Sequence, residues 1–239
     1  EKQSSITTDE LLNILNKNGK LVLKPINGSK GEGVYIFSVD DNIYYLNGQA
    51  VSISQMKNTI NALNEYWVTE FAKQHEYAEK LYKNTTNTIR IITMRNPNNE
   101  SIFIPVALQR IGNKRSIPVD NWGKGGFSAL INIDTGIIES SAAGFDSKSG
   151  LKFYDIHPES GHLIKGIKIP NWDLIKKQTI HCHTNFPAIH FIAWDVVVNQ
   201  DSFCVVELNA STDFDLFQVH MPLLSDQRIK DFYKYHGLV

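Results

Sequence analysis

The stretch Leu21-Val-Leu-Lys-Pro-Ile-Asn-Gly-Ser-Lys-Gly-Glu-Gly-Val34 is the starting point for the fold, because an apolar strand that ends at Lys24 runs directly into a glycine-rich turn. Glycine permits positive φ and brings backbone N–H groups close to a ligand, and a lysine at a strand end supplies a compact positive charge. Residues 34–39 continue as a second strand, whereas the Walker and dinucleotide fingerprints open a helix. We therefore predict a glycine-rich hairpin, which is either a flap over phosphate groups or an ordinary Asn-Gly hairpin.

The composition is that of an ordinary globular protein. Hydrophobic residues make up 42% and charged residues 21% of the 239 residues, enough for one large or two small domains. The 24 basic and 25 acidic residues nearly cancel, which argues against a broad surface for nucleic acid or anionic membranes. Two cysteines can build neither a disulfide framework nor a four-cysteine zinc site, and no apolar run reaches the roughly 20 residues of a membrane span. We expect a cytoplasmic protein without a membrane span.

The order of apolar and polar residues predicts an α+β fold. Near the start, Thr8 is a hydroxyl cap for a helix over 9–16, whose leucines have helical spacing. Helices are also expected over 52–64, 76–82, 172–184 and 223–236; strands over 42–48, 66–72, 88–95, 101–111, 127–133, 136–140, 189–198 and 203–208; and a long surface excursion over 141–170. From Thr88 onward the strands predict a mostly antiparallel sheet.

Two strands near the end of the chain carry three side chains with oxygen atoms that could bind a metal. Strand side chains alternate between faces, so Glu207 and Asn209 point the same way, and the turn at 199–202 can place Asp195 beside them. Two carboxylates and an amide oxygen suit Mg²⁺, and because like charges repel, convergence of the three requires something positive in the site. The alternative is that all three are polar strand-end residues that face solvent.

Two arginines and one asparagine complete the candidate catalytic residues. Arg90 and Arg110 each interrupt an apolar strand, where the guanidinium fork suits a phosphoryl or carboxylate oxygen, although an internal ion pair would explain either one equally well. The glycine-rich segment 120–126 is either a substrate loop with Asn121 as an oriented amide or a long hairpin turn.

Taken in order, these motifs resemble the ATP-grasp superfamily over almost the whole chain. The motifs are the glycine-rich hairpin after a Lys-Pro strand, Val68-Thr-Glu-Phe-Ala72, Asn87-Thr-Ile-Arg90, Gln109-Arg110, Asn121 with Gly125-Gly126, Asp195, and Glu207-Leu-Asn209. Within the superfamily, Asn-Thr-Ile-Arg, the loop from Val119 to Gly126, His157-Pro, Ile169-Pro-Asn-Trp172 and Ala193-Trp-Asp195 resemble the sugar-transfer-associated proteins of bacterial surface-polysaccharide gene clusters. The arrangement is also similar to glutamate ligases that modify ribosomal protein tails.

The resemblance implies a fold and a role for each matching residue. It implies a small lobe over residues 1–70 and a large lobe over 71–239, with the nucleotide between them. Lys24 matches the lysine that contacts the nucleotide phosphates, and Arg90 and Arg110 match basic residues near the transferred phosphoryl group. The remaining matches are Gly28, Ser29, Gly31 and Gly33 with the flap; Glu70, Phe71 and Ala72 with the strand that holds adenine; His75 with the ribose contact; and Asp195, Glu207 and Asn209 with the metal ligands.

The implied activity is ATP-dependent ligation of a carboxylate to an amine, or to a thiol, through an acyl phosphate. The expected partners are ATP, one or two Mg²⁺ ions or Mn²⁺ in their place, a small-molecule or glycan-linked carboxylate, and an amine acceptor, in surface polysaccharide biosynthesis. Rival hypotheses are a kinase of the same fold that phosphorylates a hydroxyl, and a non-catalytic nucleotide-binding scaffold. ATP-grasp enzymes normally have a preceding domain and a further lysine well before the Lys24 equivalent, and we expect both to be absent from these residues.

Overall fold

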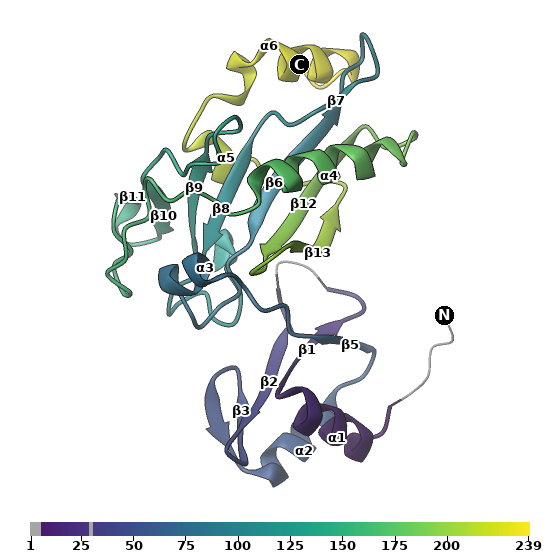
Figure 1. Ribbon diagram of the computed structural model, residues 1–239, viewed down its shortest axis with the longest axis vertical. Helices are drawn as coiled ribbons and strands as arrows, with labels where there is room; N and C mark the ends of the chain where they lie inside the picture. Colours follow the sequence, from purple (N-terminus) through teal and green to yellow (C-terminus); the bar gives the residue numbers. More distant parts are fainter. Residues whose placement is uncertain (1–5, 29–30) are drawn as a thin grey trace. The chain divides into compact units, whose positions relative to one another are not determined.

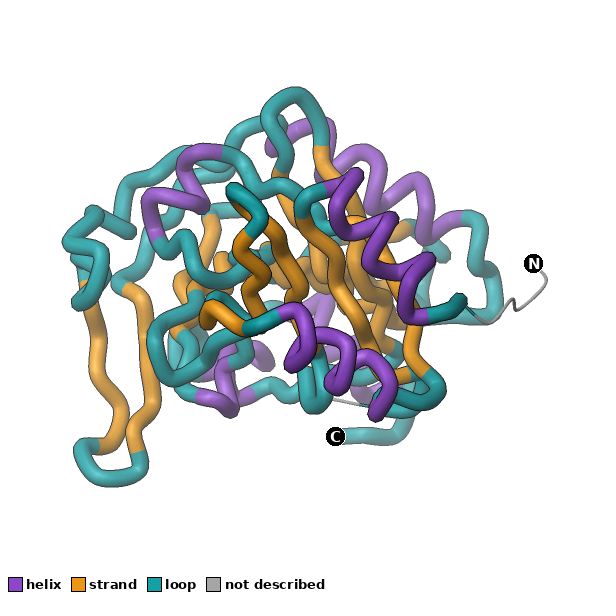
Figure 2. Tube along the Cα trace, turned by 90° about the horizontal axis from the view of Figure 1, so that it is seen from below, coloured by secondary structure: helices purple, strands orange, loops and turns teal. Residues whose placement is uncertain are grey.

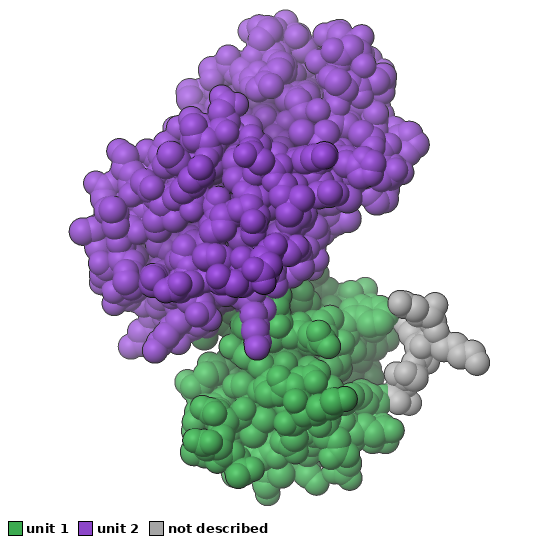
Figure 3. Space-filling model, in the orientation of Figure 1, with its two compact units in different colours: residues 1–72, 117–119 green, residues 73–116, 120–239 purple. Residues whose placement is uncertain are grey.

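The computed structural model describes residues 6–28 and 31–239 and divides the chain into two compact units (Figure 3). Unit 1 contains residues 1–72 and 117–119, and unit 2 contains residues 73–116 and 120–239. Sheets and helices occur in both units, and every strand pair described is antiparallel. The predicted α+β class with a mostly antiparallel sheet is confirmed.

Unit 1 is a five-stranded sheet with two helices. Its strand order is β4-β3-β2-β1-β5, so that the predicted glycine-rich hairpin joins the neighbouring strands β1 and β2. The elements are α1 (Thr8–Asn18), β1 (Lys20–Pro25), β2 (Tyr35–Asp40), β3 (Ile43–Leu46), β4 (Gln49–Val51), α2 (Ile53–Ala62) and β5 (Tyr66–Glu70). A core of buried leucines with Phe37 and Met56 packs between the helices and one face of the sheet.

Helix α1 begins at Thr8, one residue earlier than predicted, and its cap is therefore also one residue earlier. Thr7, rather than Thr8, is the N-cap, because its side chain accepts from the backbone N–H of Glu10 while the Glu10 carboxylate accepts from the N–H of Thr7. This reciprocal pair is a capping box, in which a threonine is followed three residues later by glutamate. The sequence contained the signal, since Thr7 and Glu10 have that spacing whereas position 11 is a leucine.

Unit 2 is built on an eight-stranded sheet in the order β11-β10-β9-β8-β6-β12-β13, with β7 paired to β6 (Figure 1). The strands are β6 (Ile89–Arg95), β7 (Ile102–Phe103), β8 (Ala107–Ile111), β9 (Phe127–Ile131), β10 (Ala142–Asp146), β11 (Gly150–Tyr154), β12 (Phe191–Val198) and β13 (Phe203–Asn209). The helices are α3 (Glu76–Leu81), η1 (Trp122–Lys124), α4 (Trp172–Thr184), α5 (Asp215–Gln218), η2 (Leu223–Ser225) and α6 (Gln227–Tyr235). No helix among the described residues is long and apolar enough to cross a bilayer.

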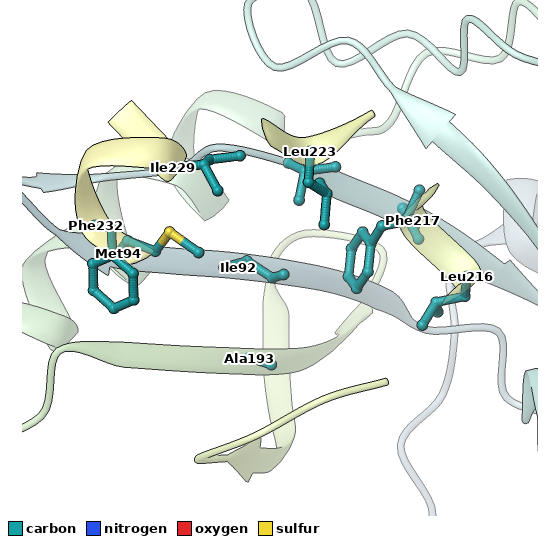
Figure 4. Packing of buried hydrophobic residues seen from close by; sticks show 10 residues of the cluster. Ile92, Met94, Ala193, Leu216, Phe217, Leu223, Ile229 and Phe232 are labelled. Carbon is teal, nitrogen blue, oxygen red and sulfur yellow. The ribbon is translucent and has the colours of Figure 1, made fainter. Parts of the chain in front are cut away.

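The large sheet is covered by helices on both faces (Figures 1 and 2). On one face, His183 of α4 contacts Thr93 of β6 at 2.7 Å, and Tyr77 of α3 donates to Gln109 of β8 at 2.9 Å. Because strand side chains alternate, Ile92 of β6 points to the opposite face. There it joins a core formed with η2, α5 and α6, which contains Met94, Val106, Leu108, Ala193, Leu216, Phe217, Leu223, Ile229 and Phe232 (Figure 4).

Three predicted elements of unit 2 are wrong. The strand expected over 101–111 is two strands, because the chain leaves the ladder around Pro105, whose ring nitrogen has no hydrogen to donate. The segment 136–140 is not a strand and contributes only isolated bridges at Ile137 and Ile138. The surface excursion expected over 141–170 contains the hairpin of β10 and β11, whose short strands have glycine and serine in their turn.

Candidate active site

One face of the large sheet carries a row of the predicted site residues. Arg90 on β6 is the cross-strand neighbour of Asp195 on β12, and Asp195 is the neighbour of Glu207 on β13. Asn209 lies two residues beyond Glu207 on the same face, and the register of the strand pair shifts directly after Asp195. The expected convergence of Asp195, Glu207 and Asn209 on one face is therefore present.

Two arginines hold the carboxylate of Asp195. Arg90 donates from Nε to Oδ1 and, at 2.7 Å, from Nη2 to Oδ2, and its Nη1 donates to Thr212 Oγ1 at 2.7 Å. Arg110 reaches the same Oδ2 from Nη1 at 2.9 Å. The internal ion pair that the sequence left open for each arginine is present in both cases. Much of the positive charge that the acidic residues require is thus supplied by the chain itself.

Asp120 is a member of this cluster that the sequence did not single out. Its Oδ1 is 2.6 Å from Arg110 Nη2, and its Oδ2 accepts at 2.7 Å from both the backbone N–H and the hydroxyl of Thr88. These contacts join Asp120 to residues 10 and 32 positions earlier in the chain, which no local pattern indicates. The available signal was an acidic residue at the start of the glycine-rich segment 120–126.

The central ions of the cluster are buried and charged. Exposed fractions are 3% for Asp195, 7% for Arg110 and 4% for Asp120, so the prediction that Asp195 could simply face solvent is wrong. Burial raises the pKa of the Asp195 carboxyl, but Arg110 and Arg90 outweigh burial and hold that pKa below its usual value. Burial lowers the pKa of Arg110, and the charges of Asp120, Asp195 and Glu207 more than offset it. Asp195 and Arg110 are therefore both ionised near neutral pH.

Asn121 caps a short helix beside the cluster. Its side-chain oxygen accepts from the N–H of Lys124 at 3.1 Å, at the start of η1, and Gly125 has a φ of +95° that suits glycine. The side chain of Asn113 donates to the carbonyl of Gly125. The loop is therefore folded tightly by its own hydrogen bonds, and the amide oxygen of Asn121 is engaged within it.

The donor set next to the arginines fits a hard cation. Two arginines face the three carboxylates of Asp120, Asp195 and Glu207, so these five side chains carry net negative charge, and Asn209 adds an amide on the same face. Carboxylate and amide oxygens are the ligands that Mg²⁺ favours when phosphates supply the rest. Among residues 6–28 and 31–239, this face included, no three His, Cys, Asp or Glu side chains by themselves form a group that could hold a metal, so a cation here would also need oxygen atoms from Asn209 and from phosphates.

In unit 1, Lys24 lies on the sheet face opposite the helical core. It is half-buried, and its cross-strand neighbour on β5 is Trp67, which is 50% exposed. In the following turn, Gly31 and Gly33 have φ values of +70° and +68°, and a Cβ on Gly33 would lie 2.9 Å from the Tyr66 hydroxyl. Glycine is thus required for the geometry of this turn. Gly28 is exposed, and Ser29 lies outside the described residues.

The four remaining predicted nucleotide residues lie at and after the end of β5. Glu70 is the last residue of β5 and pairs with Leu21, and the ring of Phe71 lies 3.7 Å below the ammonium of Lys20. Ala72 is half-buried and is the last residue of this part of unit 1. In unit 2, His75 is the N-cap of α3, and its Nδ1 accepts from the N–H of Tyr77 at 3.2 Å.

The family model for sugar-transfer associated ATP-grasp proteins matches residues 1–230. The chain belongs to this ATP-grasp family. No curated protein matches it. The resemblance to ATP-grasp proteins, which rested on the order of motifs between Lys24 and Asn209, is confirmed. The two α+β units have the fold class that the family implies.

Several solved ATP-grasp structures are similar to this ATP-grasp chain at low identity. The ligase PsnB, complexed with minimal precursor, Mg and ADP, is 11% identical with a TM-score of 0.45, over 95% of this chain and 50% of PsnB. A Chryseobacterium gregarium RiPP-associated ATP-grasp ligase in complex with ADP and a leader and core peptide is 10% identical (TM-score 0.45; 94% and 51% covered). The D-alanine--D-alanine ligase of Bacillus anthracis, complexed with ATP, is 16% identical (TM-score 0.40; 99% and 60% covered). This chain therefore spans half to three-fifths of their lengths, and its family assignment rests on the family model.

The buried histidines of this ATP-grasp chain have structural contacts. His157 bonds the carbonyl of Gly112 at 2.9 Å, and His183 bonds Thr93 at 2.7 Å and the carbonyl of Ile189 at 2.9 Å. His220 lies between the hydroxyls of Ser128 and Ser140, and burial lowers its pKa to about 4. Their ring nitrogens are engaged in packing contacts, which agrees with an oxygen-based rather than a histidine-based metal site.

Proposed function

We propose that this chain is the catalytic part of an ATP-dependent ligase that joins a carboxylate to an amine through an acyl phosphate. The observation that carries the proposal is the convergence of Arg90, Arg110, Asp195, Glu207 and Asn209 on one face of the large sheet, within a chain of the ATP-grasp family. Phosphoryl transfer requires charge neutralisation and positioning more than a protein nucleophile, and this cluster offers both.

The arginines are proposed to stabilise charge on the transferred phosphoryl group. Arg90 and Arg110 are held rigidly on adjacent strands, where their guanidinium groups can donate to phosphoryl oxygen atoms from a fixed position. Rigid donors of this kind stabilise the transition state because no energy is needed to orient them at the moment of reaction. Asn121, the third residue expected to be catalytic, is proposed as a positioning residue that acts through the loop that it caps.

Mg²⁺, held by Glu207, Asn209 and Asp195, would neutralise phosphate oxygens when bound. Glu207 is exposed and Asn209 lies two residues further along β13 on the same face, whereas Asp195 is shared with the two arginines. We therefore propose that Glu207 and Asn209 are the principal ligands and that Asp195 sets the charge balance between the cation and the arginines.

Unit 1 is proposed to bind the rest of the nucleotide. Lys24 would contact phosphates, Gly28 to Gly33 would cover them, and the backbone of Glu70, Phe71 and Ala72 would hold adenine, with His75 near the ribose. Backbone N–H groups of a turn with positive φ form an anion-binding concavity, which supports the proposal for the glycine-rich turn. The family description, sugar-transfer associated, supports a role in surface polysaccharide biosynthesis with a glycan-linked or small-molecule carboxylate.

ADP release by the purified chain tests this proposal. MgATP is supplied with a panel of sugar acids and amino acids, with and without amines, and hydroxylamine is added to trap an acyl phosphate as a hydroxamate. The ligase proposal predicts carboxylate-dependent ADP release and hydroxamate formation. ADP release that yields a phosphorylated alcohol and no hydroxamate would favour a kinase, and nucleotide binding without turnover on any substrate would favour a scaffold.

A further inference from the structure

We propose that Asp120 is a positioning residue that fixes the guanidinium of Arg110 for phosphoryl transfer. The proposal rests on the proposed function and adds to it a residue outside the expected ATP-grasp set. Asp120 lies in the loop before β9, and its two carboxylate oxygens have separate tasks. One oxygen is 2.6 Å from Arg110 Nη2, and the other accepts two hydrogen bonds from Thr88 at 2.7 Å each.

Arg110 is held at both ends of its fork. Nη2 faces Asp120 and Nη1 donates to Asp195 at 2.9 Å, so the plane of the guanidinium is set by two carboxylates on different segments of the chain. The contacts of Arg90 are with Asp195 and the hydroxyl of Thr212. If Asp195 turns toward a cation, Arg110 keeps a buried carboxylate partner in Asp120, whereas Arg90 keeps a neutral one.

Asp120 itself is placed rigidly. It is 4% exposed, Thr88 supplies a backbone N–H as well as a hydroxyl, and the backbone of its loop closes through Gly126 N–H to the Asn121 carbonyl at 3.0 Å. A Cβ on Gly126 would lie 2.6 Å from the carbonyl oxygen of Asp120, so the glycine allows this close turn. A buried carboxylate with such support can fix the direction of an arginine that acts on another group.

The test compares Asp120→Asn with Arg110→Met and with the double variant, by kcat and KM for MgATP in the ADP-release assay. Asparagine keeps the shape of Asp120. If its amide oxygen still accepts from Thr88, its NH₂ group faces the N–H of Arg110, so that two donors meet and the contact is lost. We expect kcat to fall about tenfold or more with KM changed less than about threefold, because a transition-state interaction is lost rather than nucleotide binding. In the Arg110→Met background, Asp120→Asn should add less than about a twofold loss, since its effect passes through Arg110.

Two further variants serve as a matched control and as a milder change at the same site. Asp146→Asn removes the partner of Arg115 in an exposed Arg–Asp pair and should leave kcat unchanged. Thr88→Val removes only the hydroxyl that orients Asp120 and should lower kcat about threefold, again with KM changed less than about threefold. If Asp120→Asn does not fold, Thr88→Val in the parent and Arg110→Met backgrounds decides in the same way.

A spectroscopic measurement separates this proposal from the proposed function. The side-chain Nε–H signal of Arg110 in ¹⁵N spectra, assigned by its loss in Arg110→Met, should be sharp in the parent and broadened or shifted in Thr88→Val and Asp120→Asn. Absence of any ATP turnover in the parent would overturn the ligase function and leave this measurement to judge the positioning of Arg110. A folded Asp120→Asn variant with kcat within twofold of the parent, losses that multiply in the double variant, or an unchanged Arg110 signal would overturn the positioning role.

Discussion

The same face of the large sheet has two halves of opposite character. In the apolar half, Ile92 on β6 and Ala193 on β12 are fully buried beneath α5, η2 and α6. In the charged half, two residues away on the same strands, Arg90 and Asp195 form an ion pair. The face therefore changes from apolar to charged over two residues of each strand, which is the distance between neighbouring side chains on one face.

The contrast separates a half that stabilises the fold from a half that we propose serves a site. Burial of apolar area contributes roughly 25 cal/mol per Å², so the apolar half contributes directly to stability. Buried ion pairs at best offset their desolvation, and hydrophobic residues of similar size are often as stable or more so. A cluster of Arg110, Asp120, Asp195 and Arg90 is a poor device for stability alone, and its rigid, charged groups fit a role in binding and chemistry.

Breaking the charged half at its centre should have the largest effect. Asp195→Ala leaves two buried guanidinium groups with fewer partners, so we expect a loss of about 3–5 kcal/mol in the free energy of unfolding by urea. ADP release per folded molecule should fall at least about a hundredfold, because the charge balance of the site is lost. Unfolding followed by circular dichroism and the ADP assay check both. Activity within tenfold of the parent would contradict the role given to Asp195.

Breaking the apolar half should affect stability alone. Phe217 is fully buried under the sheet, and Phe217→Ala should lower the free energy of unfolding by about 3–5 kcal/mol through lost contacts and the cavity left behind. ADP release per folded molecule should stay within about twofold of the parent at a temperature where the variant is folded. A large loss of kcat in the folded variant would show that the two halves are not separate in function.

A smaller, pH-dependent effect is expected near the border of the two halves. His220 bonds Ser128, which is the cross-strand neighbour of Arg110, and burial lowers its pKa from 6.5 to about 4. As pH falls, the unfolded chain binds a proton at this histidine at a higher pH than the folded chain does. The free energy of unfolding is therefore unaffected by His220 above pH 6.5 and decreases by about 2 to 3 kcal/mol as pH falls to 4. Urea unfolding between pH 4 and 7 measures it. His220→Gln should remove this part of the slope, and an unchanged slope would contradict the assignment to His220.

The smallest effect is expected for an Arg–Asp pair on the surface. The side chains of Arg115 and Asp146 are 48% and 34% exposed, and solvent and salt screen pairs of this kind. Asp146→Asn should change neither the urea midpoint nor ADP release measurably. A substantial loss of either would mean that exposure does not separate structural pairs from the pairs of the charged half.

The sequence predicted the elements that local periodicity defines. Helix α4 has the predicted bounds, Trp172–Thr184, because residues at helical spacing, which include Trp172 and Ile175, form its one buried face. The hairpin of β10 and β11 was missed, because its strands carry exposed Phe145, Leu151 and Phe153 rather than an alternation of buried and exposed residues, and a glycine and serines mark its turn. Short strands of this type depend on pairing with β9 rather than on local preference.

The site was predicted in its members but not in its bonding. Alternation on β13 was enough to place Glu207 and Asn209 on one face, and the hairpin register places Asp195 beside them. Sequence could not show that Asp195 is engaged by two arginines, since those contacts join residues 85 and 105 positions apart. Asp120 was missed for the same reason, because its partners Thr88 and Arg110 are defined only by the folded sheet.

Calorimetric titration of ADP, with and without Mg²⁺, is the measurement that tests the central claim most directly. The charged half is proposed to bind a magnesium nucleotide, with Glu207 as a principal ligand. We expect the parent to bind ADP at least about tenfold more tightly with Mg²⁺ than with EDTA, a difference of about 1.4 kcal/mol. Glu207→Gln should abolish that difference, whereas Asp146→Asn should retain it. Equal Mg²⁺ dependence in Glu207→Gln and the parent would contradict the claim that this face of the sheet is the nucleotide site.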